Sequence, residues 1–155
     1  MHTITTIGQL KKSGYQTKTI KQELRDNLIA SLKSGKKTFN GIIGYDTSVI
    51  PDVERAILSK HNILLLGLLG QAKTRIARQM VNLLDEYIPI VAGSEILDDP
   101  LQPLSRFAKD LIEINGDETP IEWVHRSERF GEKLATPDVT VADLIGDVDP
   151  IKAAT

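Results

Sequence analysis

The feature that most constrains the fold is a glycine-containing loop at residues 67–74, which stands between an apolar run and an amphipathic segment. The run at residues 62–66 reads Asn-Ile-Leu-Leu-Leu, a pattern typical of a strand buried on both faces. Over residues 73–86 the apolar residues recur at helical spacing, at Ile76, Met80, Leu83 and Leu84. A strand that enters the loop and a helix that leaves it predict an α/β fold with a parallel sheet.

The loop has the form of a phosphate-binding loop, Gly-x-x-x-x-Gly-Lys-Thr, except that alanine replaces its last glycine. Its residues are Gly67, Leu68, Leu69, Gly70, Gln71, Ala72, Lys73 and Thr74. The glycines permit positive φ and close backbone approach, and amides at a helix N-terminus attract phosphate. We expect Lys73 to contact the β- and γ-phosphates and the Thr74 hydroxyl to bind Mg²⁺. The alternative is a glycine-rich turn whose Lys-Thr pair has no ligand.

The loop sequence GLLGQAKT resembles the G-x-P-G-x-A-K-T loop of the MoxR branch of AAA+ ATPases, in which alanine before the lysine is usual. Leu69 replaces the proline, which should alter the stiffness of the loop more than the phosphate cradle. Upstream, the segment at residues 42–45 is similar to the family's entry segment, whose backbone lies beside the adenine. The resemblance therefore implies a nucleotide site that also includes Ile43, Gly44 and Tyr45, together with Arg75 directly after the loop.

Two further segments, at residues 134–137 and 144–149, resemble the part of magnesium-chelatase ATPase subunits that precedes a helix insertion. The resemblance implies a three-layer P-loop NTPase (AAA+) fold with a parallel sheet, truncated after its early strands. Residues 38–155 would form this partial nucleotide-binding domain, and residues 1–37 an N-terminal extension with one amphipathic helix. The resemblance also implies ATP and Mg²⁺ as cofactors, a homo-oligomeric ring and a partner with a von Willebrand type A domain. The implied role of such a ring is protein remodelling or metal insertion.

Hydrolysis in such ATPases requires a hydrophobic strand that ends in Asp-Glu. The pair Asp85-Glu86 follows an apolar stretch, but it lies on the helix that leaves the loop, so we expect it to face solvent. The acidic motif, the sensor residue and the arginine finger are expected beyond Thr155, which predicts weak hydrolysis or none. Two other functions stay open: a non-catalytic interaction or assembly module, and a nucleotide kinase, which should show an arginine-rich lid.

The rest of the chain predicts a series of shorter elements. Residues 1–16 lack periodicity and predict a poorly ordered tail. Residues 17–33 predict a helix whose apolar stripe packs on its own domain or on a partner, through Ile20, Leu24, Leu28 and Leu32. A helix from Ser48, strands at 87–92 and 121–125, a helix at 104–112, a capped helix start at Thr140 and a further helix start at 149–155 complete the prediction.

Composition excludes several functional classes. A net charge of −2 and the short basic clusters at residues 11–12 and 33–37 do not indicate nucleic-acid binding. There is no cysteine, and the three histidines have no partner at metal-ligand spacing, so neither a disulfide nor a protein-held zinc is expected. The longest apolar run is far shorter than the ~20 residues of a membrane span. We therefore expect a cytoplasmic protein with no membrane partner.

Other candidate residues have structural explanations that the sequence favours. Trp123, close to His125 and to two arginines, Arg126 and Arg129, could stack on a ligand or pack as the aromatic of a strand. Asp98 and Asp99, and the later acids Asp143, Asp147 and Asp149, could bind a metal or lie on the surface. Their spacing matches no calcium loop, so the sequence favours surface carboxylates.

Overall fold

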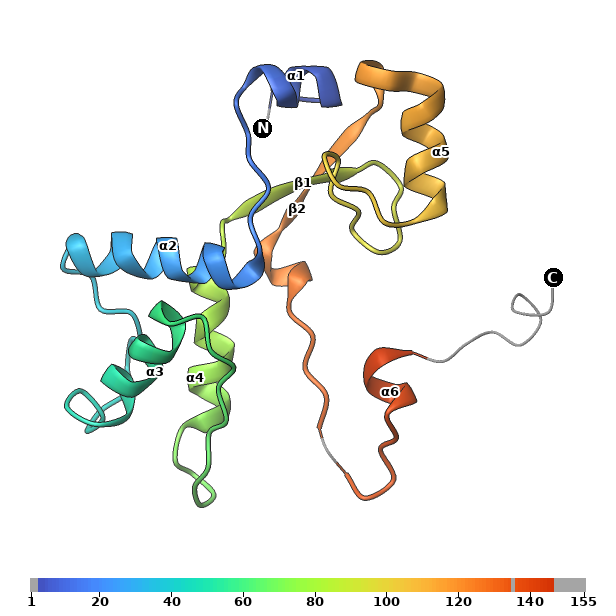
Figure 1. Ribbon diagram of the computed structural model, residues 1–155. Helices are drawn as coiled ribbons and strands as arrows, with labels where there is room; N and C mark the ends of the chain where they lie inside the picture. Colours follow the sequence, from blue (N-terminus) through green and yellow to red (C-terminus); the bar gives the residue numbers. More distant parts are fainter. Residues whose placement is uncertain (1–2, 135, 147–155) are drawn as a thin grey trace.

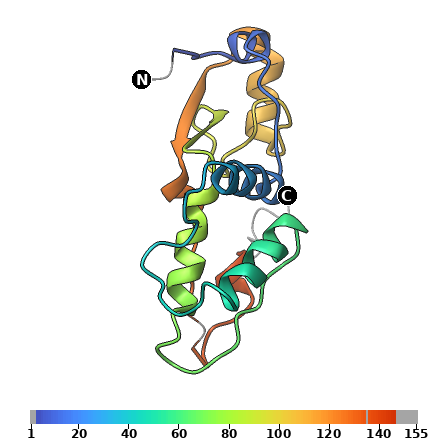
Figure 2. The same cartoon turned by 90° about the vertical axis from the view of Figure 1, so that its left-hand side faces the viewer.

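The computed structural model describes residues 3–134 and 136–146. It has a helical lobe that contains α2 (Ile20–Lys33), α3 (Val49–Leu58) and α4 (Lys73–Met80), and a hairpin lobe that contains the two strands, as Figures 1 and 2 show from two sides. The expected helix start at residues 149–155 lies outside the described residues. None of the described helices is long and apolar enough to cross a membrane.

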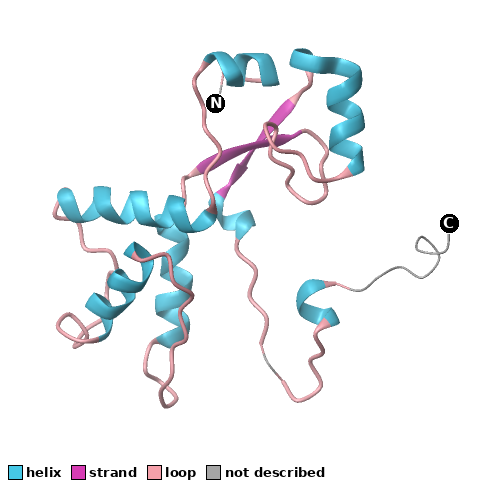
Figure 3. Cartoon of the chain, viewed as in Figure 1, coloured by secondary structure: helices cyan, strands magenta, loops and turns pink. Residues whose placement is uncertain are grey.

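The predicted three-layer α/β P-loop fold with a parallel sheet is wrong. Within the described residues the sheet consists of β1 (Tyr87–Val91) and β2 (Ile121–His125), which pair antiparallel in the hairpin lobe (Figure 3). Both strands were expected at these places, and Pro89 lies opposite Trp123 in the ladder. Because each strand of a two-stranded sheet is an edge, the missing N–H of Pro89 is tolerated.

The segment at residues 62–66 forms no strand, and this is the reason that the prediction fails. Ile63 and Leu65 pack against the helical core, whereas Leu64 is 80% and Leu66 is 83% exposed. No hydrogen bond joins the backbone of residues 62–66 to another described residue. The apolar run predicted an interior strand, but a sheet also requires a neighbouring strand, and the local pattern does not reveal whether one is present.

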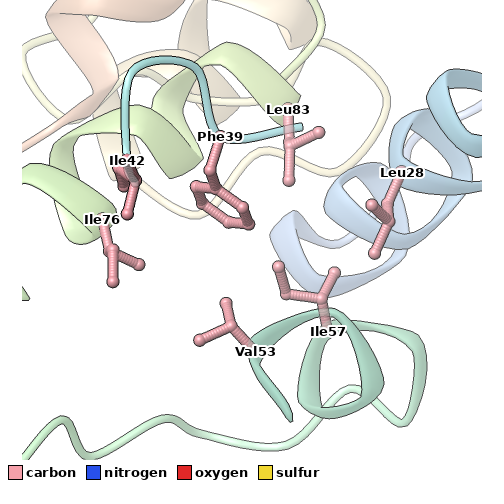
Figure 4. Close-up of a cluster of buried hydrophobic side chains, with 7 residues drawn as sticks. All are labelled: Leu28, Phe39, Ile42, Val53, Ile57, Ile76 and Leu83. Carbon is pink, nitrogen blue, oxygen red and sulfur yellow. The ribbon is translucent and has the colours of Figure 1, made fainter. Parts of the chain in front are cut away.

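The helical lobe is held together by one apolar core, which Figure 4 shows. Its buried members come from all three helices and the loops between them: Leu28, Phe39, Ile42, Val53, Ile57, Ile76 and Leu83. The predicted helix at residues 17–33 is confirmed as α2, and the Thr19 side chain caps it by accepting from Gln22 N–H. Because Leu28 of α2 is fully buried, the helix docks on its own chain, although Ile20 and Leu32 remain largely exposed.

The prediction of a poorly ordered tail at residues 1–16 is also wrong. This segment contains α1 (Ile7–Lys12), which the Thr6 side chain caps by accepting from Gln9 N–H. Ile7 and Leu10 are buried against Ile121 of β2, and a single bridge pairs Thr6 with Pro120. Two apolar residues on one short helix create no visible period, so only the hairpin beside them indicates that they are core residues.

Of the remaining helices, α4 ends at Met80, six residues before the end of the helix predicted at 73–86, whereas the other three agree with the sequence prediction to within a few residues. Helix α5 (Arg106–Asn115) covers the segment expected at 104–112, and α3 begins directly after Ser48, whose side chain makes no capping bond. Helix α6 (Ala142–Ile145) follows Thr140, whose N–H and hydroxyl both bond Asp143. Short 3₁₀ turns, η1 (Val81–Leu83), η2 (Gly116–Glu118) and η3 (Arg126–Arg129), connect these elements.

A buried ion pair joins the two lobes. Arg129, at the end of η3, donates from both terminal nitrogens to the Glu23 carboxylate of α2, at 2.7 and 2.6 Å. Glu23 is 2% exposed and also accepts the Asp85 N–H at 2.5 Å. Burial, together with the negative charges of Asp99, Glu23 and Asp85, raises the pKa of the neighbouring Tyr15 phenol to about 12. This cluster fixes α2 to the chain on both sides of the hairpin.

Candidate phosphate-binding site

The loop at residues 67–74 has a backbone suited to an anion. Gly70 has a φ of 81° and Ala72 a φ of 56°, so two residues in the left-handed region precede the helix. Helix α4 begins at Lys73, directly after Ala72. Left-handed backbone is disfavoured for alanine, and such strain is concentrated at ligand sites. A left-handed residue ahead of a helix turns successive N–H groups toward one point, which is the geometry of an anion-binding nest.

The first turn of α4 supplies further donors. The first hydrogen bond of the helix is donated by Ile76 N–H to Ala72 C=O, at 2.9 Å. The N–H groups of Lys73, Thr74 and Arg75 precede it and have no acceptor inside the helix. They lie at the positive end of the helix dipole, where a negative ligand is stabilised.

Two side chains fold across the loop. The Lys73 ammonium donates to the carbonyl oxygens of Gly67 and Leu68, at 2.8 and 2.5 Å. The Gln71 side-chain oxygen accepts the Leu68 N–H at 2.9 Å, and a Cβ added at Gly67 would collide with that side chain. The loop therefore holds an ammonium and an amide oxygen at its centre. A phosphate that entered the loop would compete with Gln71 for Leu68 N–H and would draw Lys73 away from the carbonyls.

The loop lines a cavity of about 710 Å³. Its walls are the loop and the first two turns of α4: Leu69, Gly70, Gln71, Ala72, Lys73, Thr74, Arg75, Arg78 and Gln79. Within the described part of the chain, the wall contains three cationic side chains and no carboxylate. Arg78 is paired with Glu132 through contacts of 2.7 and 2.9 Å, whereas Lys73 and Arg75 form no ion pair with any described residue. The field in this cavity favours an anion.

The loop at residues 39–45 is docked beside α4. Gln79 donates its side-chain amide to Asn40 C=O at 2.9 Å, and the Arg75 guanidinium lies so close to Gly41 that a Cβ there would come within 2.6 Å of it. Gly41 has a φ of 67°, so its backbone conformation also favours glycine. The structure thus places residues 40 and 41, directly before the segment that was expected beside the adenine, against α4.

The three residues that were predicted to lie beside the adenine, Ile43, Gly44 and Tyr45, differ in their position relative to the cavities. Tyr45 lines a second cavity, of about 370 Å³, together with Gln71 and Lys73 of the loop and with apolar side chains of α3 and residues 63–66. Ile43 is 92% exposed and lines neither cavity. Gly44, between Ile43 and Tyr45, has a φ of 86°. Of the three, only Tyr45 is therefore positioned to contact a ligand that extends from the loop.

Metal binding has less support. No group of three or more His, Cys, Asp or Glu among the described residues is arranged to hold a metal ion. Asp85 accepts from the Asn27 amide at 2.8 Å and follows η1, so it lies beyond the end of α4 that is remote from the loop. Thr74, the predicted Mg²⁺ ligand, is exposed at the start of α4. A Mg²⁺ ion at the loop would consequently depend on Thr74 and on oxygens of its nucleotide.

Two of the other candidate residues, Trp123 and Asp98, have structural roles, whereas Asp147 and Asp149 lie outside the described residues. Trp123 donates its ring N–H to Ile4 C=O at 2.9 Å and packs beside the cluster of Ile7, Leu10 and Ile121. Asp98 was expected on the surface, and this is wrong, because it is 3% exposed. It accepts from the backbone and side chain of Ser105, from the Ser94 hydroxyl and from Leu104 N–H.

Sequence reasoning missed the contacts that support the loop from outside. Gln79 and Arg78 lie on the polar side of a helix, where nothing distinguishes a supporting side chain from a solvated one. Glu132 lies in an irregular segment far along the chain from Arg78. The glycine at position 41 was the one available signal, since a turn that contacts another backbone or a bulky side chain often requires glycine.

No protein-family model, no curated protein sequence and no solved structure matches the chain. The geometry of the loop at residues 67–74 and the cavity beside it are therefore the features that indicate a function.

Proposed function

We propose that the protein binds Mg-ATP through the loop at residues 67–74. The observation that carries the proposal is the combination of left-handed Ala72, the first-turn amides of α4 that have no acceptor inside the helix, and the Lys73 ammonium, all from residues that line one cavity. The triphosphate lies against these amides, Lys73 moves from the Gly67 and Leu68 carbonyls to its oxygens, and Arg75 adds positive charge. The Thr74 hydroxyl binds the Mg²⁺ that the nucleotide brings.

The nucleobase and sugar extend toward Tyr45. The cavity of about 370 Å³ is continuous with the loop through Gln71 and Lys73 and is lined largely by apolar side chains, which suits the flat face of a base. A phenol ring can stack on a purine, so Tyr45 contributes to affinity and Ile43 does not.

Binding without appreciable hydrolysis is the expected activity of this chain. Attack on the γ-phosphate requires a positioned general base or water-orienting group. Among the described residues, the wall of the larger cavity includes no carboxylate, and Asp85 is engaged with Asn27 at the far end of α4. Asp52 lines the smaller cavity but is paired with Arg55. A role as the nucleotide-binding part of a remodelling or metal-insertion ATPase, acting in a homo-oligomeric ring, is compatible with this activity.

The experiment that tests the proposal is calorimetric titration of the protein with Mg-ATP. Replacing Lys73→Ala removes a charge-assisted contact worth about 1.5–3 kcal/mol, so affinity should fall by roughly 10–100-fold. Lys109→Ala is the matched control, because Lys109 is an exposed lysine on α5 in the other lobe and its loss should leave affinity unchanged. If both variants bind as the unmodified protein does, Lys73 has no role and the proposal fails.

A second candidate function, a non-catalytic interaction module, is favoured by one observation. The leucines at positions 64, 66, 68 and 69 are between 76% and 101% exposed, which is unusual for a contiguous stretch of a monomer. A protein that shows no heat with Mg-ATP but a defined oligomeric state would favour this function over nucleotide binding.

A further inference from the structure

The stretch from Asn62 to Ala72 carries no charged residue and is unusually exposed. Within it, Leu64 and Leu66 project from one side of an extended segment, and Ile63 and Leu65 pack inward on the helical core. Burial therefore alternates residue by residue over residues 62–66, as it does along a strand with one covered face. This alternation is typical of a strand, although no strand of the described residues lies beside the segment.

Both flanks of this segment are open. On one flank is the cavity of about 370 Å³ toward α3, and on the other is a cavity of about 380 Å³ toward α4 and residues 130–134. No backbone N–H or C=O of residues 62–66 is hydrogen-bonded to another described residue. An extended backbone with free donors and acceptors and apolar side chains is a template for pairing with another strand.

We propose that residues 62–66 pair antiparallel with the same residues of a second copy of this chain. A suitable partner is an extended, uncharged strand whose own backbone groups are unpaired. Every copy of the protein presents such a strand, so a second copy meets this requirement. A two-fold axis at Leu64 pairs Asn62 with Leu66, Ile63 with Leu65 and Leu64 with itself. The contact is isologous and closes as a dimer.

The distribution of charge selects the antiparallel arrangement. Lys60 precedes the uncharged stretch and Lys73 follows it. A parallel pair would place each of these lysines beside its own copy, and like charges directly opposite each other destabilise a ladder. In the antiparallel register the pairs within residues 62–66 are uncharged and Lys60 lies opposite the uncharged Leu68, so no two charges face each other. The proposal does not rest on nucleotide binding, but Leu64 and Leu66 also line the cavity of about 370 Å³ that we assign to the nucleobase, so dimerisation is measured without nucleotide.

The test is sedimentation equilibrium of the whole chain over a range of concentrations, for the unmodified protein and for two variants. Leu64→Lys places two ammonium groups opposite each other at the axis, and the dissociation constant of the dimer should rise at least tenfold. Leu104→Lys is the control, since Leu104 is also exposed, at 77%, but belongs to the hairpin lobe. That variant should dimerise as the unmodified protein does.

Hydrogen exchange on the unmodified protein tests the same contact without any substitution, so its result cannot be explained by a variant that fails to fold. The amides of residues 62–66 should become protected as protein concentration rises, while those of α5 stay constant. The proposal is overturned by a protein that is monomeric at all concentrations, by open-ended assembly, by a dimer that Leu64→Lys leaves intact, or by a dimer whose 62–66 amides exchange freely.

Discussion

At the scale of single residues, Gln71 is the residue whose role differs most from its place in the motif. The phosphate-loop motif allows any residue at position 71. The Gln71 side-chain oxygen nevertheless accepts a hydrogen bond from the Leu68 N–H at 2.9 Å, and a bound phosphate oxygen would use the same N–H. Gln71 and Lys73 together satisfy donors and acceptors of the loop from within the loop. Phosphate binding must first break these contacts, so they lower affinity.

Replacing Gln71→Ala should therefore strengthen Mg-ATP binding. The Leu68 N–H would no longer have a competing acceptor, and the loss of one neutral hydrogen bond of about 1 kcal/mol corresponds to a gain of roughly fivefold in affinity. Calorimetric titration beside the unmodified protein measures it. A weaker affinity in the variant would mean that Gln71 contacts the ligand instead of competing with it.

At the scale of elements, the connection between β1 and α5 is organised by one carboxylate. Asp98 holds Ser94, Leu104 and Ser105 around itself and thereby positions the N-terminus of α5, where the Ser105 side chain accepts from Ala108 N–H. Burial disfavours the charge of Asp98, but its hydrogen bonds from Ser105, Ser94 and Leu104 outweigh burial and hold its pKa far below the usual value.

The lowered pKa of Asp98 determines how the stability lost in Asp98→Asn depends on pH. A carboxyl group whose folded pKa is depressed stabilises the fold above its unfolded pKa of about 4, and this contribution is lost as pH falls toward the folded pKa. At neutral pH the variant should lose about 2 kcal/mol of unfolding free energy, the value of hydrogen bonds to a charged group. Chemical denaturation at several pH values should show that the difference in unfolding free energy between variant and unmodified protein shrinks below about pH 4. A difference that grows with acidity would contradict the lowered pKa of Asp98.

At the scale of the whole molecule, the Glu23–Arg129 pair decides whether the lobes act as one unit. Its partners come from α2 and from the end of η3, and Glu23 also accepts the N–H of Asp85, directly before the hairpin. Removing one partner of a buried pair leaves the other charge buried without compensation.

Glu23→Gln should accordingly lower the free energy of unfolding by about 3 kcal/mol, because the Arg129 guanidinium would keep a neutral acceptor in place of a carboxylate. The matched control is Asp117→Asn, which breaks the exposed pair between Lys11 and Asp117 and should have no measurable effect. Denaturant unfolding followed by circular dichroism measures both. Equal stability of the two variants would show that the buried pair is not what couples the lobes.

The sequence by itself determined the elements whose signals are local. The stripe of α2, the alternation of β2, the capping pair of Thr140 and Asp143, and the loop that precedes α4 could all be predicted, because each depends on neighbours within a few residues. The position of the candidate site was predictable for the same reason, since a loop motif and its following helix are contiguous in the chain.

Tertiary structure alone decided which elements meet. The apolar run at residues 62–66 was compatible with an interior strand, but pairing depends on a distant segment, and in this protein the sheet forms between β1 and β2 instead. Likewise, the two apolar residues of α1 become core only because Ile121 lies against them. The physical reason is that backbone hydrogen bonds across a sheet and burial across an interface are properties of pairs of segments, whereas a sequence pattern describes one segment at a time.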